Sequence, residues 1–117
     1  MKIESPSQKE SFYIAVILFE SSSNVLGYKP LYEECFVFIK ATSLEEAQDK
    51  TLVYGHAQEG NYQNENKEII NWSLKQIVDV NSVLYEEFDN GTELYARHFR
   101  NYQAYCLFDP LLSGEEL

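Results

Sequence analysis

The stretch Phe12-Tyr13-Ile14-Ala15-Val16-Ile17-Leu18-Phe19 is the longest apolar run in the chain and decides the fold. Successive side chains of a strand point to opposite faces of a sheet, and here both alternating sets are apolar. The run has the length of a strand and is too short for a membrane span of about 20 residues. We therefore predict a central strand that is covered on both faces.

A second strand is predicted at residues 31–41, beyond a loop at residues 21–30 that is rich in turn-forming residues. Its side chains alternate, so that Cys35, Val37 and Ile39 share one face of the sheet. We expect this strand to pair with the first one.

The main helix is predicted to begin at Ser43, whose side chain can cap an orphan backbone N–H group while Glu46 reaches back to the cap. Apolar residues then recur at helical spacing, and Gly60 is expected to end the helix. We expect this helix to cover one face of the sheet.

The second half of the chain contains a strand pattern and a strong turn signal. Residues 61–67 are polar and turn-like, and residues 72–80 alternate with a period of two, although Ile77 falls on the polar side. We interpret residues 72–80 as a half-buried third strand. The motif Asp89-Asn90-Gly91-Thr92 is typical of a type I′ turn, so we predict a hairpin with a strand on each side. For residues 101–108 a short helix and a strand extension both stay open.

The predicted architecture is an α+β fold, in which an antiparallel sheet of four to five strands carries one main helix on one face, in the order β-β-α-β-β-β or nearly so. We expect residues 1–11 to form a flexible N-terminus, residues 12–112 a single domain, and residues 113–117 a flexible acidic tail. If the helix covers only one face, the aromatic side chains on the other face must be few or be buried by a partner.

The chain is acidic, with 19 acidic and nine basic residues among 117 and a formal net charge of -10. This charge repels phosphate backbones and anionic lipid headgroups, so we expect neither nucleic acid nor a membrane as partner. It either keeps a small domain soluble or forms an acidic face for a basic partner. The start of the chain lacks the pattern of a signal peptide, so we predict a cytoplasmic protein in which Cys35 and Cys106 are free thiols.

The residue types that usually carry catalysis or bind cofactors form no productive pattern. The histidines and cysteines lack the spacing of a metal site, and the five glycines form no phosphate-binding loop. Adjacent carboxylates such as Glu33 and Glu34 point to opposite faces of a strand and cannot share a pocket. We therefore predict no catalytic residue, no metal and no cofactor, and we expect that the protein is not an enzyme.

Four segments together carry a resemblance to a known family, through their order more than through any one motif. They are Tyr13-Ile14-Ala15-Val16-Ile17-Leu18-Phe19-Glu20, Leu31-Tyr32-Glu33-Glu34 with Val37-Phe38-Ile39-Lys40-Ala41, Ser43-Leu44-Glu45-Glu46-Ala47 and Asp89-Asn90-Gly91-Thr92-Glu93-Leu94-Tyr95-Ala96-Arg97. With these segments the chain resembles a family of small bacterial proteins, common in cyanobacteria, that is known as domain of unknown function 4288. The resemblance implies a short bacterial cytoplasmic protein, and it carries over no activity, ligand or catalytic residue.

Tyrosine and tryptophan are enriched in the centres of protein interfaces, and the nine tyrosines here either complete the core or build such a surface. The leading hypothesis is a non-enzymatic interaction or regulatory protein that binds a protein partner or forms a homodimer. Its candidate surface consists of Glu20, Glu34, Trp72, Tyr95 and Arg97. The alternative is a small ligand-binding or hydrolase-like domain with a cleft near Glu20, Glu34, Arg97 and His98. We expect Arg97 to pair with Glu86 or Glu20.

Overall fold

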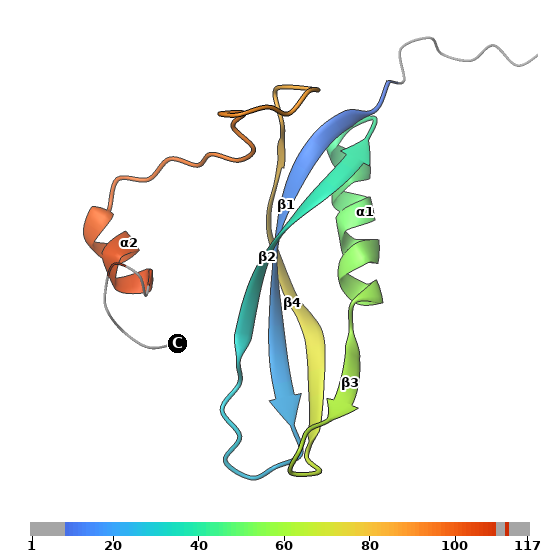
Figure 1. Cartoon of the computed structure of the whole chain (residues 1–117), viewed down its shortest axis with the longest axis vertical. Helices are drawn as coiled ribbons and strands as arrows, with labels where there is room; N and C mark the ends of the chain where they lie inside the picture. Colours follow the sequence, from blue (N-terminus) through green and yellow to red (C-terminus); the bar gives the residue numbers. More distant parts are fainter. Residues whose placement is uncertain (1–8, 110–111, 113–117) are drawn as a thin grey trace, which may run out of the picture.

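The computed structural model describes residues 9–109 and residue 112, so most of the predicted flexible ends lies outside the described residues. The elements follow in the order β1 (Ser11–Ser23), β2 (Tyr32–Ala41), α1 (Leu44–Ala57), β3 (Gly60–Gln63), β4 (Ile69–Ser82) and α2 (Tyr102–Phe108). The strands form one antiparallel sheet in the order β2-β1-β4-β3, and α1 packs on one face of it (Figure 1). The predicted α+β class and the sheet of four to five strands with one main helix are confirmed.

Strand β1 is the centre of the sheet, because β2 pairs along one side of it and β4 along the other. Ala15, Val16 and Ile17 are fully buried, which requires that both faces of β1 are covered at its middle. The predicted central strand is therefore confirmed. The predicted strand stops too early, at Phe19, because pairing with β4 extends β1 to Ser23.

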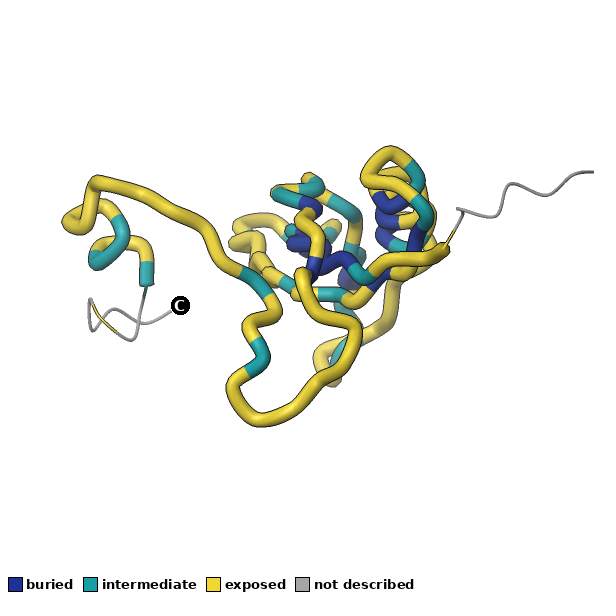
Figure 2. The backbone as a smooth tube through the Cα atoms, turned by 90° about the horizontal axis from the view of Figure 1, so that it is seen from above, coloured by how far each residue is buried: buried dark blue, intermediate teal, exposed yellow. Residues whose placement is uncertain are grey.

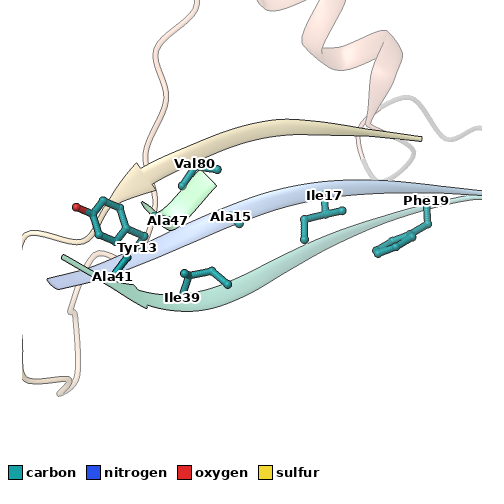
Figure 3. Packing of buried hydrophobic residues seen from close by; sticks show 8 residues of the cluster. All are labelled: Tyr13, Ala15, Ile17, Phe19, Ile39, Ala41, Ala47 and Val80. Carbon is teal, nitrogen blue, oxygen red and sulfur yellow. The ribbon is translucent and has the colours of Figure 1, made fainter. Parts of the chain in front are cut away.

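The main core lies between the sheet and α1. Tyr13, Ala15, Ile17 and Phe19 alternate along β1 toward the helix, and they pack with residues of β2, β4 and α1 (Figure 3). On the helix, Gly55 faces β4 at close range, because a Cβ atom placed there would lie 3.1 Å from Leu74 Cδ2. The small residue lets the end of α1 approach the sheet closely.

The start of α1 follows the sequence signal, and its end does not. Ser43 Oγ accepts a hydrogen bond from the backbone N–H of Glu46 at 3.1 Å, which confirms the predicted cap. The Glu46 carboxylate does not return to the cap: it accepts from the Thr42 hydroxyl at 2.6 Å and pairs with Lys50. The helix ends at Ala57, and Gly60 begins β3 instead of ending α1.

The irregular pattern of residues 72–80 has a structural cause. Strand β4 shifts its register against β1 twice, between Val16 and Ile17 and again between Leu18 and Phe19. These irregularities let Leu74, Ile77 and Val80 all pack toward the core, so the residue that broke the period-two pattern is a core residue. The third predicted strand is confirmed, and β3 is an additional short strand in the region predicted to be turn-like.

The predicted hairpin around Asn90 and Gly91 is wrong, although its turn exists. Gly91 has a φ of 88°, and the backbone N–H of Thr92 donates to the carbonyl of Asp89 at 3.0 Å. No strand flanks this turn within the described residues. The segment lies across a face of the sheet, where its aromatic side chains pack, and a backbone in that position has no strand edge to pair with.

Residues 101–108, which the sequence left open, contain helix α2. Asn101 caps it by accepting from the backbone N–H of Ala104 at 3.0 Å. Within the described residues, α2 packs against no other helix or strand, and it stands apart from the sheet at the end of an extended connection (Figures 1 and 2). The helix is therefore an arm of the molecule and not part of its core.

Candidate interaction surface

The face of the sheet opposite α1 is apolar at its centre, and no helix covers it within the described residues. The register pairs Ile14 with Phe38 and Val16 with Phe36, so all four side chains share this face. Ile14 and Val16 are buried, whereas Phe36 is 64 % exposed and Phe38 is 42 % exposed. The cover on this face is therefore incomplete over β2.

The segment from residue 83 to residue 95 provides this partial cover, and three aromatic contacts hold it, two by Phe88 and one by Tyr95. The Phe88 ring packs against Phe12 and Phe38, with centroid distances of 5.6 and 6.0 Å. The Tyr95 ring stacks on Phe36 at 5.8 Å. Aromatic contacts at such distances stabilise by about 0.5 to 1.5 kcal/mol each beyond their buried area.

Tyr95 also makes the one polar contact that ties this segment to β4. Its hydroxyl donates to Asp79 Oδ2 at 2.7 Å, a distance typical of a hydrogen bond to a carboxylate. This bond to Asp79, together with burial, raises the pKa of Tyr95, because ionisation would place a phenolate beside a carboxylate. The protonated tyrosine is therefore the form that holds the segment in place.

Between the sheet and this segment lies a groove of about 480 Å³. Sites that hold a side chain cluster or a small ligand have volumes of this order. Its lining is almost wholly apolar, with a single carboxylate at one end, and consists of Ile14, Phe36, Phe38, Phe88, Asp89, Thr92, Leu94 and Tyr95. We call this site the aromatic groove. Its composition suits an apolar side chain and offers no general acid-base pair.

The structure brings only some of the five residues of the predicted surface together. Glu20, Glu34 and Tyr95 are on the groove side of the sheet, since Glu34 pairs with Leu18 and Glu20 lies two residues further along β1. Trp72 packs on the α1 side, against the main core. Arg97 follows Tyr95 in the extended connection and is exposed, and its charge and that of Glu34 both act on the pKa of Tyr95, so these three residues are neighbours.

The expected ion pairs of Arg97 are also wrong. Glu20 lies 3.6 Å from Lys75 Nζ and accepts a hydrogen bond from the Tyr32 hydroxyl, which raises the pKa of Tyr32. Glu86 instead pairs with Lys9 at 3.0 Å. The pair of Lys9 and Glu86 is exposed and stabilises the fold little. Lys75 on the neighbouring strand β4 reaches Glu20, and Lys9, which precedes β1, reaches Glu86, so Arg97 pairs with neither.

The alternative cleft gains no support from this arrangement. Glu20, Glu34, Arg97 and His98 are absent from the lining of the aromatic groove. Among the described residues, no group of three or more histidine, cysteine, aspartate or glutamate side chains is arranged to hold a metal ion. Nor does any helix in that part of the chain have the length and apolar character to cross a membrane.

Sequence reasoning missed the residues that form the groove, apart from Tyr95. Phe36 and Phe38 were visible as the second face of their strand, opposite Cys35 and Val37. Their exposure depends on how far the segment after β4 reaches over them. No short sequence pattern predicts how much of these two rings that segment covers.

Together these features define an α+β protein whose four-stranded antiparallel sheet carries a helix on one face and an open aromatic groove on the other. The family model described as Domain of unknown function (DUF4288) matches residues 12–96, and the chain belongs to this family. The match spans β1 to β4 and ends just after Tyr95, before α2. Comparisons with curated proteins and with solved structures gave no match.

Proposed function

We propose that the protein is a non-enzymatic interaction module that self-associates, and that the aromatic groove of one copy receives α2 of a second copy. The observation that carries the proposal is that one chain contains both an open apolar groove and an apolar helix that packs on no other helix or strand within the described residues; its Tyr105 ring stacks only on Phe99 of the connection before it. Large contiguous apolar patches are rare on monomeric proteins unless a partner covers them. A cytoplasmic location and a bacterial origin belong to the same proposal.

Helix α2 has the chemistry that the groove requires. Its residues Tyr102–Phe108 include no charged side chain. Leu107 is 72 % exposed and Phe108 is 68 % exposed, so both are available to a second molecule. Figure 2 shows that the extended connection holds α2 apart from the sheet. No residue of α2 lines the groove of its own chain.

Reciprocal exchange of α2 between two copies covers both surfaces at once. In a two-fold dimer each copy gives one arm and one groove, so the two contacts are identical and the assembly is closed. A standard interface takes about 800 Å² from each partner, and in this arrangement each copy contributes both its groove and its isolated helix to the buried surface.

The net charge opposes self-association and therefore predicts how dimerisation depends on the salt concentration. Each copy has a net charge of -10, so two copies repel each other at low ionic strength. The proposed contact itself contains only one carboxylate, that of Asp89. We therefore expect the dimer to become tighter as the salt concentration rises, the reverse of a contact built on ion pairs.

The test is light scattering on the full chain at micromolar concentration, with one variant for each side of the contact. Leu107→Asp changes the arm and Phe36→Asp changes the groove, and each alone is expected to give a monomer. Leu26→Asp is the matched control, because Leu26 is fully exposed in the loop after β1. A mixture of the two monomeric variants is expected to form a heterodimer, since it retains one intact arm and one intact groove.

A wild-type chain that stays monomeric at every salt concentration contradicts the proposal. A dimer that survives both substitutions contradicts the assigned surfaces. Circular dichroism shows whether each variant keeps its fold, so that unfolding is not taken for loss of the contact.

A further inference from the structure

A second hollow lies on the opposite side of the sheet, where α1 ends and the sheet continues beyond it. Its volume is about 420 Å³. Four aromatic rings line it, each from a different element: Phe19 of β1, Tyr54 of α1, Tyr62 of β3 and Trp72 of β4. The polar part of its lining comes from Glu33, Cys35, Gln58 and Asn61. We call this site the aromatic cage.

The register of the sheet explains why these residues meet. Phe19 pairs with Glu33, and Trp72 pairs with Gly60, two residues before Tyr62 on the same face of β3. All of them point to the side of the sheet on which α1 packs. Because α1 ends at Ala57, the helix covers only part of this face and leaves the rest open. Tyr54, near the end of α1, lines the resulting hollow.

The rings of the cage do not stack on one another. The ring pairs found in residues 9–109 and 112 all involve other aromatic residues. Phe19 is buried and forms the floor, whereas Tyr62 is half exposed and forms the rim. Aromatic rings that surround a space without stacking leave their electron-rich faces available to a ligand.

The only carboxylate of the cage lacks a cationic partner. Glu33 Oε1 accepts a hydrogen bond from Cys35 Sγ at 3.2 Å. No lysine, arginine or histidine within the described part of the chain lies within ion-pair distance of Glu33. A carboxylate beside several ring faces, in a protein with a net charge of -10, makes the site attractive to a cation.

We propose that the aromatic cage binds an alkylated ammonium cation, with a trimethylammonium group among the rings and Glu33 beside it. A cation over an aromatic face is attracted by the ring quadrupole, and quaternary ammonium groups are the ligands that such cages recognise. A primary ammonium is more strongly hydrated than a trimethylammonium group, so contact with ring faces compensates less of the cost of removing its water. The site is independent of the aromatic groove, because the two lie on opposite faces of the sheet.

The test uses Trp72, the single tryptophan of the chain, as the reporter. Choline chloride is titrated into the full-length protein while tryptophan fluorescence is recorded, with sodium chloride at matched ionic strength as the reference. A saturable change specific to choline is expected. The uncharged isostere 3,3-dimethyl-1-butanol has the same shape and is expected to bind about tenfold more weakly, the size of a partly desolvated cation–π contribution.

Two neighbouring glutamates give a matched pair of variants. Glu33→Gln removes the carboxylate of the cage and is expected to weaken choline binding severalfold. Glu34→Gln removes a carboxylate one residue away that points to the other face, and it is expected to leave binding unchanged. Tyr62→Leu removes an exposed ring and is expected to weaken binding without unfolding the protein.

The same titration separates the two sources of this ligand. Tight binding of choline and weak binding of a peptide with trimethyllysine indicate a small-molecule ligand, and the opposite order indicates a modified protein. Both results support the cage. It is contradicted if neither probe gives saturation, if the neutral isostere binds as well as choline, or if Glu33→Gln and Glu34→Gln have equal effects.

Discussion

Replacing Tyr95 by phenylalanine tests whether one hydrogen bond keeps the segment after β4 on the sheet. The substitution removes the bond from the Tyr95 hydroxyl to Asp79 Oδ2 at 2.7 Å and retains the ring that stacks on Phe36. A hydrogen bond to a charged group contributes about 1.5 to 3 kcal/mol when it is well buried. Both groups are half buried here and water competes for them, so we expect a loss of about 1 kcal/mol.

The pH dependence of this loss has a definite sign. The pKa of Tyr95 is raised by its bond to Asp79, so the folded state favours the protonated phenol. The stabilisation is therefore fully present below the unfolded pKa of 10.0 and disappears as the pH rises through the raised folded value. Wild type and Tyr95→Phe should differ by a constant amount up to about pH 9 and converge at higher pH.

The assay is urea unfolding of the wild type and of Tyr95→Phe from pH 7 to pH 11. Tyr85→Phe is the matched control, since Tyr85 lies on the same segment, is exposed and donates no hydrogen bond in the structure. Equal stability of the wild type and Tyr95→Phe at pH 7 refutes this account of the segment. So does a difference between them that persists unchanged at pH 11.

Three further predictions concern the core, the helix cap and the cysteine beside the cage. Ile17→Ala leaves a cavity at a fully buried position and should lower the free energy of unfolding by about 3 to 4 kcal/mol. Val53→Ala, at an exposed position, should change this free energy by less than about 0.5 kcal/mol. Equal losses for the two variants in denaturant unfolding would contradict the assignment of Ile17 to the core. Ser43→Ala should cost about 1 kcal/mol in the same measurement, because the Glu46 N–H loses its acceptor, and no loss would mean that water replaces the cap without cost. Burial, and then the bond to Glu33, raise the pKa of Cys35 to about 11, so iodoacetamide should label it slowly at pH 8 in a Cys106→Ser background. Glu33→Gln should accelerate this labelling and Glu34→Gln should not; equal rates in the two variants would show that Glu33 has no influence on the thiol.

The central strand and the cap of α1 follow from the sequence because each depends on local chemistry. Two alternating apolar sets in residues 12–19 require cover on both faces wherever the strand lies. Ser43 caps the helix through a bond that spans three residues. Both features depend on residues that are close together in the sequence, so the rest of the fold alters them little.

The arrangement of β4 and of the segment after it could not be predicted in the same way. The two register shifts of β4 depend on its pairing with β1, and they bring Ile77 into the core against a period-two pattern. A turn forms at Gly91, but Asn90 lacks the positive φ of the predicted type I′ turn, and the packing of Phe88 and Tyr95 on a distant face decides what surrounds it. Long-range contacts overrode a local hairpin preference.

The structure places the residues predicted as one interface on two faces of the sheet. Tyr95 lines the aromatic groove and Trp72 lines the aromatic cage. The alternation of side chains along a strand assigns residues to faces only when the register between strands is known. The sequence therefore singled out these aromatic residues without showing that they lie on opposite faces of one sheet.

Cross-linking from α2 tests the central claim most directly. A photoactivated benzophenone is attached to Cys106, which lies in α2, in a Cys35→Ser background. Protein labelled with heavy nitrogen is mixed with unlabelled protein, so that mass spectrometry distinguishes links between copies from links within one. The account predicts mixed-isotope links from Cys106 to the peptides that contain Phe36, Phe38 and Leu94. Links confined to single copies, or links between copies that avoid these peptides, would contradict it.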